Sequence, residues 1–279
     1  MSGSKQTIKT RIRGIKTTKK ITKAMELIAI GKLKRQRDLF ESNRIYAQGI
    51  KDTISDILSN TKDVENVFIE AREDTHPLTI VFVSDMGLCG GYNSNVIRQL
   101  LDGAAQHSEI LVIGSRGKAA LLENGFQLTP GDIPSDNINY LVLFKLAEQI
   151  IDRYRHKTIT SISIIYTEYV NSMRFVAKTE RLLPVSYQEH RGEKYQEIIY
   201  EPNAEAILED LIPLYLKSLL YSYWLESTTS EHSARRLAMD LATDNAEELI
   251  DHLTLEYNRA RQASITQEIN EIVMTADAV

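Results

Sequence analysis

The sequence predicts an α/β protein with long helices, in which the N-terminal and C-terminal helices pair as an antiparallel coiled coil beside a smaller α/β domain. Three observations support this prediction. From Asn203 to about Thr275 the chain has no glycine and a single proline, Pro213. Apolar residues recur at helical spacing in both terminal segments, whereas strand-like and helical runs alternate between them. The two terminal segments also carry opposite charge, which favours their pairing.

The first segment, residues 1–58, is expected to form one long helix from about Lys5 to Leu58. Its apolar stripe is narrow, which is typical of a coiled-coil seam. Between Lys5 and Arg37 there are twelve basic residues and one acidic residue, Glu26. No aromatic residue lies among these basic residues, which disfavours nucleic-acid binding, although a simple solvated face remains possible. The stripe consists of Ile8, Ile12, Ile15, Thr22, Met25, Ala29, Leu33, Ala47, Ile50, Ile54 and Leu58.

Residues 59–77 are expected to form a linker, and residues 78–202 a Rossmann-like α/β domain. Strands are predicted at residues 78–84, 109–114, 158–166 and 175–177, because these runs are apolar and rich in β-branched residues. Helices are predicted from Asn93, at 118–124 and at 140–154. The alternation of strands and helices predicts a parallel sheet.

The last segment, residues 203–279, is predicted to be the longer helix, with Asn203 as N-cap. Pro213 is expected to kink it, and the polar run 227–230 to weaken its continuity. Acidic residues outnumber basic ones about three to one after residue 200. Because this helix is longer than the first, its final turns must extend past their partner or be covered by another protein. The predicted seam is Ile207, Leu211, Leu216, Leu219, Leu220, Tyr223, Trp224, Ala234, Leu237, Leu241, Leu249, Leu253, Tyr257, Ala260, Ile265, Ile269 and Ile272.

No set of catalytic residues, cofactor site or metal site is predicted. The glycine-rich turn 84–93 and the run 114–119 lie where a phosphate loop would lie, but neither matches a known phosphate-binding pattern. Cys89 has only His76 and His107 as nearby histidines in sequence, so a buried structural cysteine is favoured over a nucleophile. His232 and His252 lie twenty residues apart on one helix and cannot share a metal within that helix.

Composition excludes several classes of protein. The chain has 279 residues, a net charge of −5 and one cysteine, which rules out an internal disulfide framework. No run of eighteen apolar residues occurs, and the N-terminus has no apolar stretch, so neither a membrane span nor a signal peptide is expected. A location on the cytoplasmic side of a membrane fits this composition.

Five separate segments resemble the gamma subunit of F-type ATP synthases, in the expected order along the whole chain. They are residues 20–26 (KITKAME), 84–93 (SDMGLCGGYN), 200–202 (YEP), 242–246 (ATDNA) and 260–269 (ARQASITQEI). The resemblance implies the central rotor shaft of a rotary ATP synthase, a non-catalytic subunit involved in ion transport and peripheral to the cell membrane.

The same resemblance implies the partners and the contact residues. The partners would be the alpha and beta subunits of the catalytic hexamer, the epsilon subunit and the membrane c-ring, with no nucleic acid and no direct binding of nucleotide. The shaft would force the hexamer's three catalytic sites into different states by rigid-body rotation. The positions expected to bind partners are Lys23, Met25, Arg235, Gln262, Thr266 and Glu268, with Tyr200 toward the foot of the shaft.

Departures from the family pattern leave alternatives open. Met86 stands where an arginine is usual, and Asp277 lies in a tip that is otherwise small and apolar. These departures leave room for the rotor of a diverged F-type-like ATPase that drives another process. A free-standing nucleotide-binding enzyme would need a phosphate loop, and a coiled-coil adaptor would not explain the five matching segments.

Overall fold

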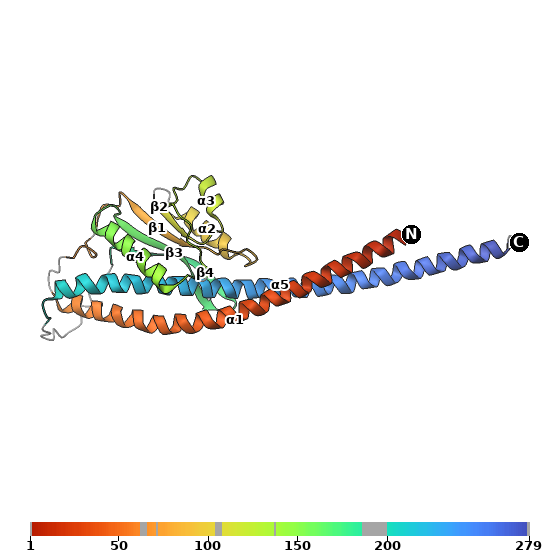
Figure 1. Ribbon diagram of the computed structural model, residues 1–279, viewed down its shortest axis with the longest axis horizontal. Helices are drawn as coiled ribbons and strands as arrows, with labels where there is room; N and C mark the ends of the chain where they lie inside the picture. The colour runs from red at the N-terminus through yellow and green to blue at the C-terminus, as the bar shows by residue number, and fades with distance from the viewer. Residues whose placement is uncertain are drawn as a thin grey trace. The chain divides into compact units, whose positions relative to one another are not determined.

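The computed structural model describes residues 2–61, 66–70, 72–103, 108–136, 138–185 and 200–277 (Figure 1). Two compact units are present, one formed by Met1–Ala29 with Arg235–Val279 and the other by Ile30–Ala234. Both long helices contribute to each unit. In chain order the elements are α1 (Ser2–Asn60), β1 (Pro77–Phe82), α2 (Tyr92–Asp102), β2 (Glu109–Ile113), α3 (Lys118–Glu123), α4 (Tyr140–Arg155), β3 (Ser161–Asn171), β4 (Arg174–Leu183) and α5 (Ala204–Asp277).

The two long helices are as extensive as the sequence predicts. At the start of α5, the side chain of Asn203 accepts a hydrogen bond from the Ala206 amide at 2.8 Å, which confirms the predicted N-cap. Pro213 lies inside α5 without ending it. A proline cannot donate to the carbonyl four residues earlier, that of Glu209, and this oxygen accepts from the Arg155 guanidinium at 3.5 Å.

The sheet lies in the unit formed by residues 30–234 and has the strand order β2-β1-β3-β4. Strand β1 pairs in parallel with β2 and β3, as the alternating pattern predicts. The last pairing is different, because β3 and β4 form an antiparallel hairpin. At its turn the Asn171 side chain accepts from the amides of Met173 and Arg174, each at 2.9 Å. Such an asparagine-stabilised turn needs no crossover helix.

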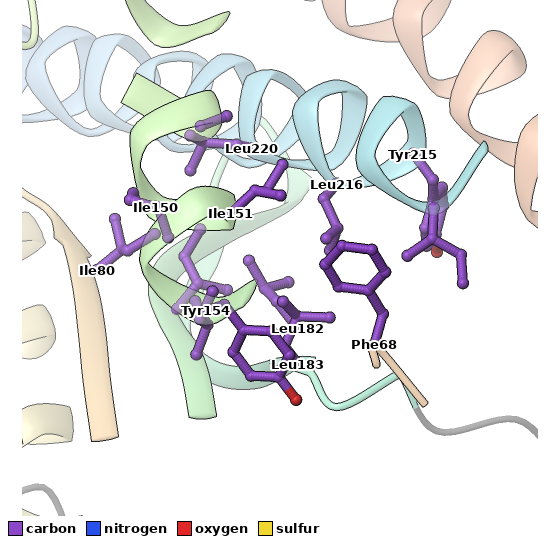
Figure 2. Close-up of a cluster of buried hydrophobic side chains, with 14 of the residues drawn as sticks. Phe68, Ile80, Ile150, Ile151, Tyr154, Leu182, Leu183, Tyr215, Leu216 and Leu220 are labelled. Atoms are coloured by element: carbon purple, nitrogen blue, oxygen red, sulfur yellow. The ribbon is translucent and has the colours of Figure 1, made fainter. Parts of the chain in front are cut away.

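The sheet is buried on both faces, because alternate residues of its central strand point in opposite directions. From β1, Ile80 and Phe82 enter a core that also includes side chains of α1, α4 and α5 (Figure 2). Val81 points the other way, into a second core with Val96 of α2 and Leu121 of α3. Each fully buried side chain of this size contributes about 1.5 to 3 kcal/mol, so the two cores hold the helices on the sheet.

A polar segment of α5, residues 227–233, hydrogen-bonds to the part of β3 that extends beyond its pairing with β1. Ser227 Oγ accepts from the Thr167 amide at 3.1 Å, and Ser230 Oγ donates to the Thr167 carbonyl at 3.0 Å. Farther along, Ser233 Oγ donates to the Ser172 carbonyl at 2.8 Å. The prediction that residues 227–230 weaken the helix is therefore wrong. These side chains are polar because they replace the strand that the free edge of β3 lacks.

The other unit contains an antiparallel pair made by the first half of α1 and the last part of α5. Lys5 Nζ donates to Ser264 Oγ at 2.9 Å, whereas Lys19 pairs with Glu247 at 2.9 Å. As residue numbers rise on one helix they fall on the other, which confirms the antiparallel pairing. The register leaves about ten residues of α5 beyond the start of α1, and Figure 1 shows α5 continuing past that end.

The seam of this pair differs from the predicted one on α5. Leu253 is buried as predicted, but the predicted Leu241 and Leu249 are 64% and 47% exposed. Met239 and Ala246, which were not predicted, are buried instead. The predicted row fails at Leu241 because this residue follows the buried Met239 by two positions, which is about 200° around the helix and faces away from α1. Ile265, Ile269 and Ile272 are likewise exposed.

Candidate partner-binding surface

Small and polar side chains lie at the centre of the helix pair. The Thr22 and Thr243 hydroxyls lie 2.8 Å apart, and both residues are buried. Each hydroxyl also lies within hydrogen-bond distance of a carbonyl of its own helix, those of Lys19 and Met239. Since a hydroxyl has one proton, one threonine donates across the pair and the other donates to its own helix. Threonine side chains are small enough for the two helices to approach closely, and their hydroxyls stay hydrogen-bonded although they are buried. The pair is thereby fixed at the level of the KITKAME segment.

Lys23 stands beside this contact with its side chain exposed. Its ammonium lies 2.8 Å from the Glu26 carboxylate. That hydrogen bond raises the pKa of Lys23, and the nearby carboxylates of Asp240 and Asp244 raise it further. The acidic face of α5 therefore lies close to the basic face of α1, as the charge asymmetry predicts. The Lys23 side chain is 52% exposed although that of Glu26 is only 9% exposed, so Lys23 remains accessible to a partner.

The predicted contact residues on α5 fall into two groups. Gln262, Thr266 and Glu268 are all exposed, and Thr266 Oγ1 donates to the Gln262 carbonyl at 3.0 Å. Glu268 accepts from the Ser264 hydroxyl at 3.1 Å. Arg235 differs, because only 8% of its surface is exposed. The sequence does not distinguish this buried position from the exposed ones.

The remaining two predicted contact residues are half-buried. Met25 belongs to the helix pair, next to the buried Glu26. Tyr200 belongs to the other compact unit, where burial raises the pKa of its hydroxyl. Six of the seven predicted positions therefore belong to one unit, and Tyr200 belongs to the other.

Exposed apolar side chains occur along the helix pair, and only those at the end of α5 were predicted from the sequence. Ile21, Leu27 and Ile28 of α1 are 55 to 60% exposed. On α5, the exposed large apolar residues are Leu241, Leu249, Leu255, Ile265, Ile269, Ile272, Val273 and Met274. A rod two helices wide cannot cover so many apolar side chains by itself, and such patches mark protein interfaces. The sequence did contain a signal for this exposed surface. Leu27 and Ile28 are adjacent on a helix, so they cannot both face one seam.

The glycine-rich turn after β1 is held by its own side chains. Ser84 Oγ donates to the Met86 carbonyl at 2.7 Å and accepts from the Asn93 amide group at 2.7 Å. The same amide group contacts the Cys89 sulfur at 3.4 Å, and Cys89 is 2% exposed. Asp85 accepts from the Ser115 hydroxyl at 2.7 Å. These contacts support the interpretation of Cys89 as a buried structural residue.

The second glycine-rich turn is also structural. Gly117 has φ +92°, and a Cβ there would lie 2.6 Å from the Ile97 side chain. Lys118, which a phosphate loop would direct at its ligand, instead pairs with Asp132 at 2.6 Å. This ion pair lowers the pKa of Asp132. The position needs glycine for its backbone conformation.

Other kinds of site are not found in the part of the chain that the structure describes. No three His, Cys, Asp or Glu side chains gather there as a metal site would require. His107, one of the two histidines considered as a base for Cys89, lies outside the described residues. None of the described helices is long and apolar enough to cross a bilayer.

Comparison with known proteins identifies relatives along the full chain. The family model described as ATP synthase matches residues 4–279. The chain is 38% identical to the ATP synthase gamma chain of Alkaliphilus metalliredigens, covering 98% of each protein. It is also 38% identical to the ATP synthase gamma chain of Clostridium novyi, covering 97% of this chain and 96% of that one.

The fold matches chains of two solved assemblies. One belongs to a Euglena gracilis mitochondrial ATP synthase structure of OSCP, F1 and c-ring, with a TM-score of 0.73, 18% identity and coverage of 100% of this chain and 95% of that chain. The other belongs to the central stalk and c-ring of the Tetrahymena thermophila enzyme, with a TM-score of 0.61, 23% identity and coverage of 80% of this chain and 99% of that chain. At these identities the likeness concerns the fold.

Proposed function

Because the chain belongs to the gamma-chain family of ATP synthases, we propose that its helix pair acts inside the ring of alpha and beta subunits and its α/β unit on the membrane side. The chain is the rotor shaft of an F-type ATP synthase and a non-catalytic subunit. The observation that supports the placement of the helix pair is its exposed apolar surface. Ile265 and Ile269 are 45% and 54% exposed, four residues apart on one face of α5.

The contacts with the alpha and beta subunits would combine this apolar surface with exposed polar groups. Lys23 is an exposed cation, and Gln262, Thr266 and Glu268 present polar groups beside Ile265. Met25 and Arg235 are less exposed than these residues, and they would contact the partner at the most buried part of the same surface. Apolar anchors give an interface its affinity, whereas charges at its rim fix its register.

The contacts with the epsilon subunit and the c-ring would lie on the unit formed by residues 30–234. Tyr200 belongs to this unit, and so do three exposed apolar side chains, Ile45 (74%), Tyr46 (51%) and Leu141 (61%). Exposed groups of this size support a protein contact on this unit. The proposed location is the cytoplasmic side of the cell membrane, with the chain peripheral to it.

Reconstitution with alpha and beta subunits tests the surface of the helix pair. Ile269→Asp places a charge on the proposed interface, and we expect lower co-purification of the hexamer and lower ATP turnover of the complex. The matched control is Glu256→Gln, because Glu256 is an exposed polar residue of the same helix. Both variants should keep the circular dichroism and melting temperature of the parent chain. Normal assembly and turnover of Ile269→Asp would contradict the placement.

Truncation from the C-terminus tests the same surface in another way. Deleting residues 276–279 should change assembly and turnover little, because the exposed row at Ile265 and Ile269 remains. Deleting residues 265–279 removes that row and should reduce both. Complete loss of turnover on deletion of the last four residues would show instead that the tip itself is the essential contact.

Calorimetry with the isolated chain tests the absence of nucleotide binding. We expect no heat of ATP binding at micromolar concentrations, because Lys118 is paired with Asp132 and the glycine-rich turn after β1 is held by its own side chains. Micromolar binding that is abolished by Lys118→Ala would contradict the non-catalytic role.

A further inference from the structure

A half-buried carboxylate, Glu226 of α5, joins the helix to the outer part of β3. Its Oε1 accepts a hydrogen bond from the Tyr169 amide at 3.1 Å. Tyr169 lies beyond Ile165, the last β3 residue that pairs with β1, so its amide has no strand partner on that side. Glu226 is the one charged member of a row in which Ser227, Ser230 and Ser233 otherwise supply hydroxyls. A carboxylate is more costly to bury there than a hydroxyl.

Titratable and charged groups face Glu226 from every neighbouring element. From β3 come Glu168 and Tyr166, from β4 Lys178, from α1 Arg44, and from α5 itself Tyr223. Glu180 of β4 acts on Tyr166, Lys178 and Tyr223 in this group. One of the two cations, Lys178, is already engaged, because its Nζ lies 2.7 Å from the Glu168 carboxylate. The negative charges around Glu226 are thus only partly balanced.

We propose that Glu226 is a proton-sensitive contact, which holds the outer part of the β3–β4 hairpin on α5 when protonated and releases it when ionised. A protonated carboxyl still has a carbonyl oxygen that accepts from the Tyr169 amide, so the hydrogen bond survives protonation. Ionisation leaves a charge in a site that solvates it poorly. Movement of the hairpin away from α5 would give that charge access to water.

The expected pH dependence follows from the two states of the carboxyl. Burial raises the pKa of Glu226 to about 7, with the Glu168 charge adding to the effect, whereas the Tyr169 hydrogen bond opposes it. In an opened hairpin the carboxyl would return toward 4.5. The closed state therefore binds the proton more tightly, so opening becomes more favourable as pH rises from about 4.5 to about 7 and changes little above that.

Amide hydrogen exchange of Tyr169 in the full chain measures this opening. After division by the intrinsic exchange rate, the opening constant should rise about tenfold between pH 5.5 and pH 8, allowing for partial solvent exposure. Glu226→Gln keeps an acceptor oxygen and cannot titrate, so its opening constant should stay flat. The Ile80 amide of β1, between two strands, serves as the internal control and should not change in either protein.

Carboxyl-carbon NMR of the same chain gives an independent measurement. Glu226 should titrate with a midpoint near 7, and the Tyr169 amide shift should follow that midpoint. Two results would overturn the proposal: a Glu226 midpoint near 4.5, or equal Tyr169 opening constants in the parent chain and Glu226→Gln at every pH. Neither measurement involves other subunits, so its outcome is separate from that of the proposed rotor function.

Discussion

Replacing Ser227 with alanine should destabilise the α/β unit by about 2 kcal/mol. Ser227 is 1% exposed and its hydroxyl accepts from the Thr167 amide, which is itself in a buried residue. The substitution removes one oxygen and leaves that amide without its acceptor and shielded from water. An unsatisfied buried donor costs about 1 to 3 kcal/mol, whereas a missing exposed hydrogen bond costs much less.

Urea unfolding followed by tryptophan fluorescence is the assay. Trp224 is the only tryptophan, it is 3% exposed, and its indole donates to the Ser135 carbonyl at 3.1 Å. Its emission therefore reports on the unit that contains Ser227. A loss of about 2 kcal/mol lowers the folding equilibrium constant about 30-fold.

The control for this experiment is Ser42→Ala on α1. Ser42 Oγ donates to the Asp38 carbonyl at 3.0 Å, but this bond is exposed and lies within one helix. Its removal should change stability by less than about 0.5 kcal/mol. If Ser227→Ala cost no more than Ser42→Ala, the hydroxyl would not be completing the sheet edge, and the explanation for the polar segment of α5 would be refuted.

Three further predictions concern the seam, an ion pair and a turn. Leu253→Asp should separate the helix pair, seen as lost helicity, whereas Leu249→Asp should not, because Leu253 is 4% and Leu249 47% exposed. Arg153 hydrogen-bonds to Glu109 and lowers the pKa of that carboxyl, so this pair should stabilise the chain above pH 4.5 and lose its effect as pH falls; the acid limb of a urea-stability profile should be shallower in Glu109→Gln. Gly114→Ala should prevent a stable fold, measured by melting temperature, because a Cβ there would lie 2.1 Å from a main-chain oxygen and φ is +110°.

The sequence was sufficient for the long helices and for the parallel part of the sheet. Both depend on local periodicity, and Asn203 at the start of α5 acts as the predicted cap. The antiparallel pairing of the helices was also predictable, because their charges and lengths are features of the sequence alone. Lys19 and Glu247 make one of the expected ion pairs.

Two features could not be predicted because they depend on tertiary contacts. Ser227 and Ser230 look like a helix break in the sequence, since their hydroxyls suit turns, and only the position of β3 shows what they bind. The seam on α5 was predicted only in part for a related reason. Apolar spacing does not show which of two stripes faces the partner helix, and Leu253 and Leu249 differ in exposure only because α1 covers one of them.

The row of α5 side chains on the β3–β4 hairpin has a mechanical consequence for a shaft. Glu226, Ser227, Ser230 and Ser233 contact the hairpin together. Successive residues of a helix are separated by about 100° around its axis, so a slip by one residue would turn all four side chains away from the strand at once. Under torque, α5 and the sheet should therefore turn together until all four hydrogen bonds break at once.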